Sequence, residues 1–265
     1  MTATALGWAN LSAPELFAMA ANETSRRHVI ETLSSMQADP NWTPVIVGMV
    51  QSGKLETRTL LSWLAAELKP ATYLEVGVRR GFSMAVVARE SPGVSIYGFD
   101  RWLSNYAGSE NPGPQFVESE LRRLGYTGRA KFISGNSHKT LRSFFGNPER
   151  RWWQLGKAAP RDADQPASFD LMLIDGDHSL LGAYQDLMDT LPHLAPGGVM
   201  VFDDVAVSPD DVDPEAQRKE AGPDPHGWGN LLGVWKAATG KFPELKTFEF
   251  LDNTPGVAVA IRRAE

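Results

Sequence analysis

Two hydrophobic patterns divide the chain near residue 70. Before it, apolar residues recur at helical spacing in three stretches, residues 14–21, 23–36 and 55–68. After it, short continuous apolar runs alternate with helical stretches, and most of the runs end close to Gly or Asp. The runs are residues 72–76, 94–99, 131–133, 169–174, 198–202, 247–251 and 257–261. We therefore predict a helical segment, residues 1–70, that caps the fold or mediates oligomerisation, followed by one domain, residues 71–265.

Short apolar strands that alternate with helices are typical of a mostly parallel sheet covered on both faces. The last two runs are separated only by Asp252-Asn-Thr-Pro-Gly256, which is too short for a parallel crossover. The pattern thus predicts a Rossmann-like, doubly wound α/β fold whose seven-stranded, mostly parallel sheet ends in an antiparallel hairpin. Two polar stretches, residues 146–167 and 205–229, are predicted to be insertion or lid loops.

Composition narrows the possible functions. The 265 residues include no cysteine, which excludes disulfides, thiolate metal sites and cysteine nucleophiles. A formal charge of −6 with scattered Lys and Arg does not favour nucleic acid as a partner. The N-terminus has no basic segment and no apolar run is long enough to span a bilayer, so we expect a cytoplasmic protein without a membrane span.

The first predicted strand ends in the motif Glu75-Val-Gly77-Val-Arg-Arg-Gly81, and a helical pattern follows. Glycines at a strand-to-helix turn let a ligand approach the backbone and the free N–H groups of the helix. The second strand ends in Asp100, where a carboxylate can accept both hydroxyls of a ribose, although a turn or N-cap role is the structural alternative. Trp102 beside it either stacks on an adenine ring or packs in the core. This arrangement indicates a nucleotide-type cofactor.

Carboxylates also follow the fourth and fifth strands. The fourth ends at Asp175 and the fifth at Asp203 and Asp204, and parallel neighbours end on the same edge of a sheet. Like charges at close quarters raise one another's pKa, and a divalent cation such as Mg²⁺ compensates them. We predict a metal site formed by Asp175, Asp203 and Asp204. In the alternative, Asp203 and Asp204 cap the following turn and Asp175 alone touches the cofactor.

His178 follows Asp175 by three residues. Histidine titrates near neutrality and can take a proton from a substrate hydroxyl at a metal site. We predict His178 as the general base, with Asp175 as the second catalytic residue. Asp177 is the alternative base, or orients His178.

Residues 73–83, Gly98-Phe-Asp100 and the acidic strand ends resemble the class I S-adenosylmethionine-dependent methyltransferases. Within that class the chain is similar to the family that contains the macrocin-type and cephalosporin-biosynthesis O-methyltransferases. The resemblance covers about residues 50–205 and the final hairpin. It implies that S-adenosylmethionine is the cofactor and that the residues at the strand ends bind it. The implied cofactor-binding residues are Glu75, Gly77, Gly81, Ser83, Asp100, Trp102, Asn136, Ser137 and Asp175.

The expected reaction is methylation of a hydroxyl that has a neighbouring oxygen, because chelation needs two donors. A sugar diol, a polyketide or glycoside hydroxyl and a catechol-like ring all fit. The alternatives are metal-independent methylation, an NAD(P)-dependent oxidoreductase and a non-catalytic S-adenosylmethionine-binding protein. A homo-oligomer is expected as well, with aromatic residues such as Trp8 and Trp63 either packing on a second subunit or forming a lid.

Overall fold

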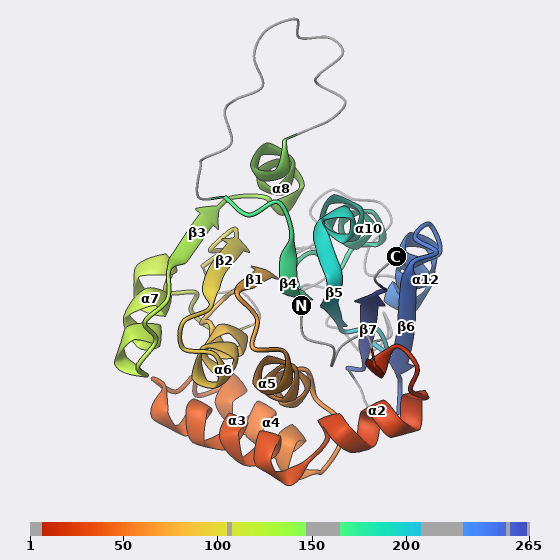
Figure 1. The fold of residues 1–265 in the computed structure, drawn as a ribbon. Coiled ribbons are helices and arrows are strands. Elements are labelled where there is room, and N and C mark those ends of the chain that lie inside the picture. Colours follow the sequence, from red (N-terminus) through yellow and green to blue (C-terminus); the bar gives the residue numbers. More distant parts are fainter. Residues whose placement is uncertain (1–6, 105–107, 147–164, 208–229, 253–254, 264–265) are drawn as a thin grey trace, which may run out of the picture.

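The computed structural model describes residues 7–104, 108–146, 165–207, 230–252 and 255–263. Within these residues, seven strands form one sheet in the order β3-β2-β1-β4-β5-β7-β6 (Figure 1). The strands are β1 (Thr72–Val76), β2 (Ser95–Asp100), β3 (Ala130–Ser134), β4 (Phe169–Ile174), β5 (Leu194–Asp203), β6 (Leu245–Phe250) and β7 (Val257–Arg262).

The sheet reverses direction only at its last two strands. Strands β1 to β5 pair in parallel, whereas β7 runs antiparallel to both β5 and β6. The predicted Rossmann-like fold with a terminal antiparallel hairpin is confirmed. Because β1 lies between β2 and β4, the turn that follows β1 lies beside the ends of both neighbours.

Helices cover both faces of the sheet (Figure 1). One face carries α5, α6 and the N-terminal helices, and its buried residues form one hydrophobic cluster. The other face carries α8, α10 and α12, which pack in a second cluster. The helices are α2 (Ala13–Ala20), α3 (Glu23–Ser35), α4 (Trp42–Gln51), α5 (Thr57–Leu68), α6 (Phe82–Glu90), α7 (Pro114–Arg123), α8 (Ser137–Phe145), α10 (Leu180–Thr190), the 3-10 helix η1 (Leu191–His193) and α12 (Leu231–Thr239).

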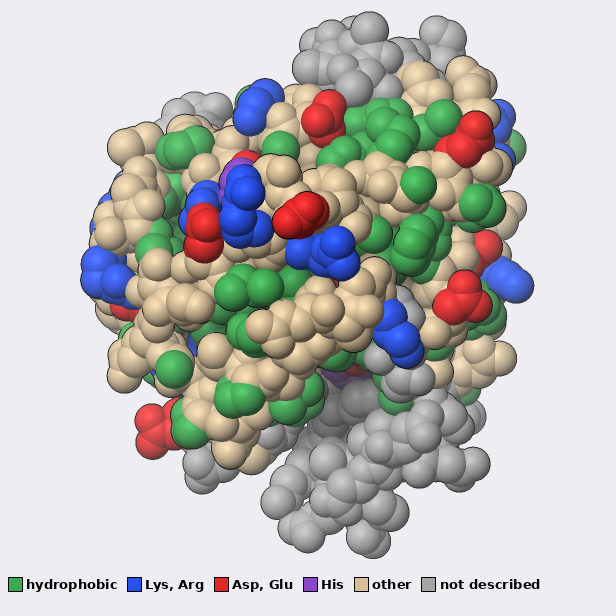
Figure 2. Space-filling view, turned by 90° about the horizontal axis from the view of Figure 1, so that it is seen from below, with side chains coloured by type: hydrophobic (Ala, Val, Ile, Leu, Met, Phe, Trp, Pro, Cys, Tyr) green, Lys and Arg blue, Asp and Glu red, His purple; other side chains and the backbone are tan. Residues whose placement is uncertain are grey.

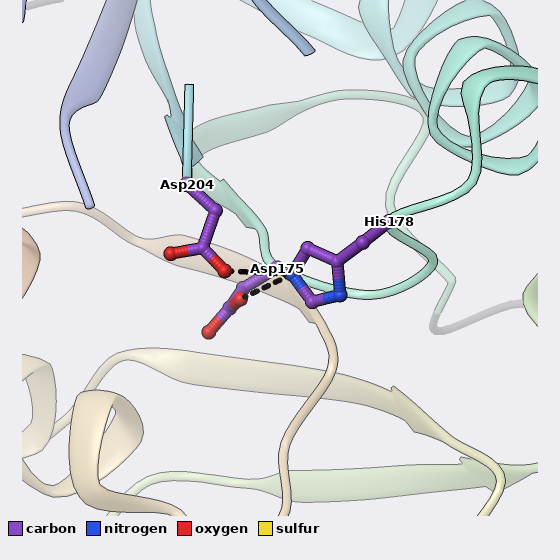
Figure 3. Close-up of side chains that lie close together, drawn as sticks. All are labelled: Asp175, His178 and Asp204. Atoms are coloured by element: carbon purple, nitrogen blue, oxygen red, sulfur yellow. Dashed lines mark ion pairs between the residues drawn. The ribbon is translucent and has the colours of Figure 1, made fainter. Parts of the chain in front are cut away.

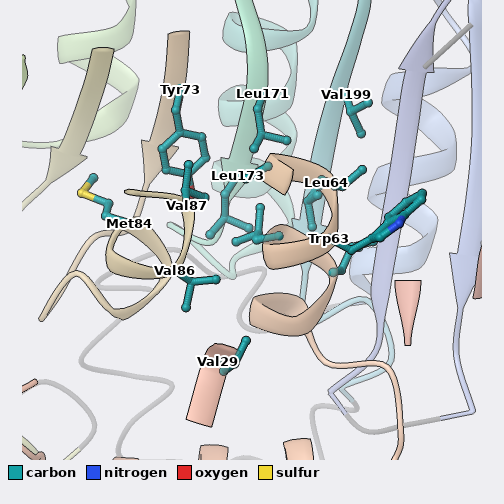
Figure 4. Packing of buried hydrophobic residues seen from close by; sticks show 14 of the residues in the cluster. Val29, Trp63, Leu64, Tyr73, Met84, Val86, Val87, Leu171, Leu173 and Val199 are labelled. Atoms are coloured by element: carbon teal, nitrogen blue, oxygen red, sulfur yellow. The ribbon is translucent and has the colours of Figure 1, made fainter. Parts of the chain in front are cut away.

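The N-terminal helices share their core with the sheet. Figure 4 shows Val29 of α3 and Leu64 of α5 in the same packed layer as Tyr73, Leu171 and Val199 of the strands. Burial of such side chains contributes about 1.5–3 kcal/mol each, so α5 is part of the layer that covers the sheet. The role of residues 1–70 in oligomerisation remains a prediction.

Trp8 and Trp63 pack against each other in the interior and do not lie on the exposed surface. Their ring centroids lie 4.5 Å apart, and the residues are only 4% and 5% exposed. The apolar periodicity of residues 55–68 correctly predicted the helix that carries Trp63, but periodicity does not say which partner covers an aromatic side chain.

Helix α5 is held at both ends by local chemistry. Glu56 is its N-cap, and the Glu56 side chain accepts hydrogen bonds from the backbone N–H groups of Arg58 (2.9 Å) and Thr59 (3.1 Å). At the other end Lys69 adopts a left-handed conformation (φ 48°) immediately before Pro70, where a helix cannot continue. Residue 57 therefore has a fixed position at the start of the helix.

The face that carries the N-terminal helices bears interspersed acidic and basic side chains (Figure 2). Glu31 of α3, for example, pairs with Arg27 at 3.8 Å and with Arg89. In the described parts of the chain, every helix is too short or too polar to cross a bilayer. The predicted loops 146–167 and 205–229 fall mostly outside the described residues.

Candidate active site

The predicted cofactor turn joins β1 to α6 and depends on glycine at two positions. Gly77 has φ +88°, and a Cβ at this position would lie 1.7 Å from the carbonyl oxygen of Asp175. Gly81 is the N-cap of α6 with φ +74°, a conformation that other residues rarely adopt. Ser83 lies in the first turn of the same helix and is buried. The turn thus brings the N-terminus of α6 close to the end of β4.

Asp100, at the end of β2, is fixed by four N–H groups. Oδ2 accepts hydrogen bonds from the backbone of Val78 and Arg79, both at 2.8 Å. Oδ1 accepts from the backbone of Trp102 and, at 3.3 Å, from Nδ2 of Asn111. A carboxylate has about four acceptor positions, so a ribose hydroxyl would have to replace one of these donors. Asn111 makes the longest of these contacts and is the donor most easily replaced.

Asn111 also offers a free acceptor. Its Oδ1 is buried and has no hydrogen-bond partner among the described residues. A buried amide oxygen without a partner is costly, and a polar ligand beside Asp100 would satisfy it. Sequence reasoning missed Asn111, because a single Asn in a loop between β2 and α7 carries no motif.

Glu75 points into the protein interior. It is 1% exposed and accepts a hydrogen bond of 2.7 Å from the hydroxyl of Tyr73. Burial raises the pKa of Glu75 well above its usual value, and the neighbouring carboxylates of Asp175 and Asp100 raise it further. The Tyr73 contact is a structural role for the Glu75 side chain, and its predicted contact with the cofactor remains a prediction.

Three other predicted cofactor residues have structural partners at the ends of β2 and β3. Trp102 donates from Nε1 to Oγ of Ser134 at 3.0 Å. Asn136 caps α8 by accepting a hydrogen bond of 2.9 Å from the backbone of His138, and Ser137 is the first residue of that helix. All three lie at the carboxyl edge of the sheet, where cofactors bind in this type of fold.

The acidic strand ends converge on a histidine. Nε2 of His178 lies 2.9 Å from Oδ2 of Asp204 and 3.5 Å from Oδ1 of Asp175 (Figure 3). One ligand atom from each of the three residues lies within 4.8 Å of the other two. His178 is 7% exposed, while the side chains of Asp175 and Asp204 are each 21% exposed. The cluster is therefore partly shielded but can be reached from solvent.

Asp203, the third predicted metal ligand, lies outside this cluster. Its Oδ1 accepts hydrogen bonds from the hydroxyl of Thr57 (2.6 Å) and from the backbone N–H of Asp204 (2.9 Å). The sequence analysis assigned Asp203 and Asp204 to the same metal site because they are adjacent in the chain. Consecutive residues at a strand end point in different directions, and here only Asp204 faces His178.

Asp177, the alternative base, also lies outside the cluster. Its Oδ1 accepts a hydrogen bond of 2.9 Å from the backbone of Ser179, and its Oδ2 lies 3.4 Å from Nε2 of His138. Of the two candidate bases, His178 is the one that the structure brings next to Asp175 and Asp204.

Burial and mutual repulsion make the acidic groups hard to ionise. Burial raises the pKa of Asp175, and Asp204 raises it further, whereas the His178 contact lowers it. Burial also raises the pKa of Asp203 well above its usual value, with further contributions from Asp175 and Asp204. The carboxylates need nearby positive charge if they are to be ionised together.

Arg58 supplies some of that charge. Its side chain is 16% exposed and pairs with Glu56. Burial alone would lower the pKa of Arg58, but the carboxylates of Glu56, Asp203 and Asp175 raise it above its usual value. Sequence reasoning missed Arg58 and Thr57, because only the tertiary fold brings the start of α5 to the end of β5.

The donor set fits a divalent cation. Two carboxylate oxygens and one imidazole nitrogen converge, and carboxylates suit Mg²⁺ or Mn²⁺. If His178 itself were a ligand, the imidazole would favour a transition metal, whereas a metal held by the carboxylates alone leaves His178 to move a proton. Asp175 and Asp204 are thus the residues that would hold the ion.

A small surface depression lies at the start of α5, and none of Asp175, His178, Asp203 and Asp204 lines it. Thr57 and Arg58 line it together with apolar residues such as Met49 and Val257. Val257 of β7 is the pairing partner of Asp203 in β5, so the depression borders the carboxyl end of that strand.

Comparison with known proteins agrees with this geometry. Residues 74–205, which run from β1 to just beyond the end of β5, match a family model described as a methyltransferase domain. No curated protein sequence matches the chain.

Solved structures share the fold. The SAH-bound methyltransferase PaMTH1 from Podospora anserina aligns with a TM-score of 0.53 and 17% identity, covering 92% of this chain and 89% of that protein. The O-methyltransferase TomG from Streptomyces achromogenes, involved in tomaymycin synthesis and solved with SAM, aligns with a TM-score of 0.52 and 16% identity. That alignment covers 86% of this chain and 92% of TomG. At these identities the likeness shows the fold.

Proposed function

With residues 74–205 matching the methyltransferase family, this chain is a class I S-adenosylmethionine-dependent methyltransferase, and we propose that it methylates a hydroxyl oxygen of a small molecule with the help of a divalent cation. The observation that carries the proposal is the cluster of Asp175, His178 and Asp204 at the carboxyl ends of β4 and β5. The macrocin-type subfamily remains a prediction from the sequence.

The cofactor turn and the acidic cluster are adjacent. Gly77 lies so close to the carbonyl oxygen of Asp175 that position 77 has no room for any side chain. We assign the methionine part of the cofactor to the turn of Gly77, Gly81 and Ser83, and the ribose to Asp100 with Asn111. A methyl group presented from this turn then faces the end of β4, where the acceptor oxygen has to be.

The protein residues orient the acceptor and remove its proton. Asp175 and Asp204 would hold the cation, which, when bound, supplies positive charge that favours the ionised form of a nearby hydroxyl. His178 takes the hydroxyl proton on Nε2 as the new oxygen–carbon bond forms and the sulfur–carbon bond of the cofactor breaks. The sulfonium is already activated, so proximity and orientation supply much of the remaining acceleration.

The acceptor is proposed to carry two neighbouring oxygens, as in a sugar diol, a glycoside or polyketide hydroxyl, or a catechol-like ring. A cation held by Asp175 and Asp204 would attract both oxygens of such an acceptor, which would leave the reacting hydroxyl within reach of His178. TomG, a structural neighbour, is described as an O-methyltransferase.

The test is transfer of a tritiated methyl group from S-adenosylmethionine to a panel of catechols and vicinal diol glycosides. Labelled product should form with Mg²⁺ or Mn²⁺ and disappear after treatment with EDTA, and metal should restore it. Full activity of the metal-free protein would contradict the role of the cation. Methylation confined to nitrogen or carbon acceptors would contradict the assignment to oxygen.

One observation favours metal-independent methylation as the second candidate. The Arg58 guanidinium already acts on both Asp175 and Asp203 and compensates part of their charge. In that case His178 would still remove the proton, and the EDTA-treated protein would retain its activity. The same assay therefore separates the two candidates.

We also keep the homo-oligomer as a proposal. Met19 of α2 and Val45 of α4 are large apolar residues that are 40% and 48% exposed on the N-terminal helices. Light scattering coupled to gel filtration measures the mass in solution. A monomer at micromolar concentration would contradict this proposal.

A further inference from the structure

Thr57 is the first residue of α5, and its hydroxyl reaches across the fold to the acidic site. The Thr57 Oγ1 donates a hydrogen bond of 2.6 Å to Oδ1 of Asp203, 146 positions along the chain. Both residues are buried, at 3% and 4% exposure. The Glu56 cap fixes the start of α5, so Thr57 has little freedom to move away.

The same Asp203 oxygen holds the backbone of the next residue. Oδ1 of Asp203 also accepts a hydrogen bond of 2.9 Å from the backbone N–H of Asp204. Asp204 has φ +61°, a left-handed conformation that costs energy for any residue except glycine and persists only where its surroundings impose it. The Asp203 carboxylate fixes the peptide plane that precedes Asp204, because it binds the Asp204 N–H directly, and it thereby fixes the point from which the Asp204 side chain departs.

This conformation decides where the Asp204 side chain points. Oδ2 of Asp204 lies 2.9 Å from Nε2 of His178 (Figure 3). If the Asp203 carboxylate rotated, the peptide plane before Asp204 would lose this contact and could turn, and the Asp204 side chain would shift away from His178. A chain of contacts thus runs from Thr57 through Asp203 and Asp204 to His178.

We propose that Thr57 is a positioning residue for the cation site: it holds Asp203 so that Asp203 keeps Asp204 aimed at the position of the ion. The inference rests on the proposed metal-assisted function. It assigns to Asp203 a supporting role behind the ligands, and it explains why α5, outside the residues that match the methyltransferase family, is packed against the end of β5. Partners behind the ligands of a metal site commonly contribute 10- to 100-fold in metal affinity.

The test measures Mn²⁺ binding by the paramagnetic resonance of free Mn²⁺, with S-adenosylhomocysteine present. Thr57→Val, which replaces the hydroxyl by a methyl group of similar size, should weaken Mn²⁺ binding by about 10-fold or more. Thr57→Ser, which keeps the hydroxyl, should bind within about twofold of the wild type. Thr57→Ala provides a second loss of the hydroxyl if the valine variant does not fold.

Thr59→Val is the matched control. Thr59 lies one half-turn further along α5, is fully buried, and its hydroxyl has no hydrogen-bond partner among the described residues. This variant should bind Mn²⁺ as the wild type does. Wild-type affinity in Thr57→Val or Thr57→Ala would overturn the positioning role alone. Failure of the wild-type protein to bind Mn²⁺ at all would overturn the metal site, and the positioning role with it.

Discussion

The raised pKa of Asp186, a buried carboxyl group behind the acidic cluster, leads to a quantitative prediction for protein stability. Asp186 lies on α10, is 0% exposed, and packs against Gly176 in the loop that carries Asp175 and His178. Burial raises the pKa of Asp186 from 3.8 to about 7, and hydrogen bonding by Ser137 lowers it only in part. His138 lies 3.7 Å from Asp186, but burial lowers the pKa of that imidazole, so it offers little compensating charge at neutral pH.

The sign of the effect follows from linkage. Between pH 3.8 and about 7 the folded protein keeps a proton that the unfolded chain releases, so Asp186 lowers stability progressively as the pH rises through this window. A shift of about 3 pKa units corresponds to about 4 kcal/mol at pH 8 and about 2 kcal/mol at pH 5. Asp186→Asn removes the charge and should stabilise the protein by amounts of this order.

Urea denaturation at pH 5 and pH 8 provides the measurement. The variant should exceed the wild type in free energy of unfolding at both pH values, and by about 2 kcal/mol more at pH 8 than at pH 5. Asp252→Asn, at an exposed position after β6, is the control and should change little. A gain that is equal at the two pH values, or no gain at pH 8, would refute the account of Asp186 as a buried group held protonated.

Three further predictions test the proposed base His178, the turn at Gly77 and the proposed ribose contact of Asn111. His178→Ala should lower the rate of methyl transfer by about 10²- to 10⁴-fold, with S-adenosylhomocysteine affinity by calorimetry within about twofold; weakened cofactor binding with normal turnover would instead make His178 structural. Gly77→Ala should destabilise the protein by about 3 kcal/mol or more in thermal unfolding, because its Cβ would meet backbone atoms. The control Gly48→Ala in α4, where a Cβ meets no atom, should stabilise by up to about 1 kcal/mol, and equal melting temperatures of the two variants would contradict the steric argument. Asn111→Ala should weaken S-adenosylhomocysteine binding by about tenfold, the equivalent of one hydrogen bond of about 1.4 kcal/mol; unchanged affinity would exclude Asn111 from the cofactor site.

The sequence predicted the sheet well because its strands are buried on both faces. Continuous apolar runs identified the strands, and the short connection before β7 correctly predicted the antiparallel end. The edge strand β3 and the first part of β5 were predicted too short. The predicted runs left out the end residues Ala130 and Ser134 of β3, and the segment Leu194-Ala-Pro-Gly197 at the start of β5, where Pro196 and Gly197 are typical of a turn. Helix α4 was not singled out, because its apolar run Val45-Ile-Val-Gly-Met-Val50 shows little of the alternation that marks an amphipathic helix.

The site was predictable only as far as strand ends determine it. Parallel neighbours end at one edge, so the meeting of Asp175 and Asp204 followed from topology. The different positions of the Asp203 and Asp204 side chains could not be predicted from topology. They depend on the direction of each side chain and on a contact with Thr57, which is remote in sequence. Contacts between residues that are remote in sequence produce no periodic pattern in a single sequence, so they could not be predicted from it.

The most direct test of the account is a crystal structure with S-adenosylhomocysteine and Mn²⁺, with the ion located by its anomalous scattering. The account predicts one strong anomalous peak within about 2.6 Å of carboxylate oxygens of Asp175 and Asp204, with the cofactor sulfur on the side of the Gly77 turn. A structure with the cofactor bound and no peak at this cluster at saturating Mn²⁺ would contradict metal-assisted transfer at this site.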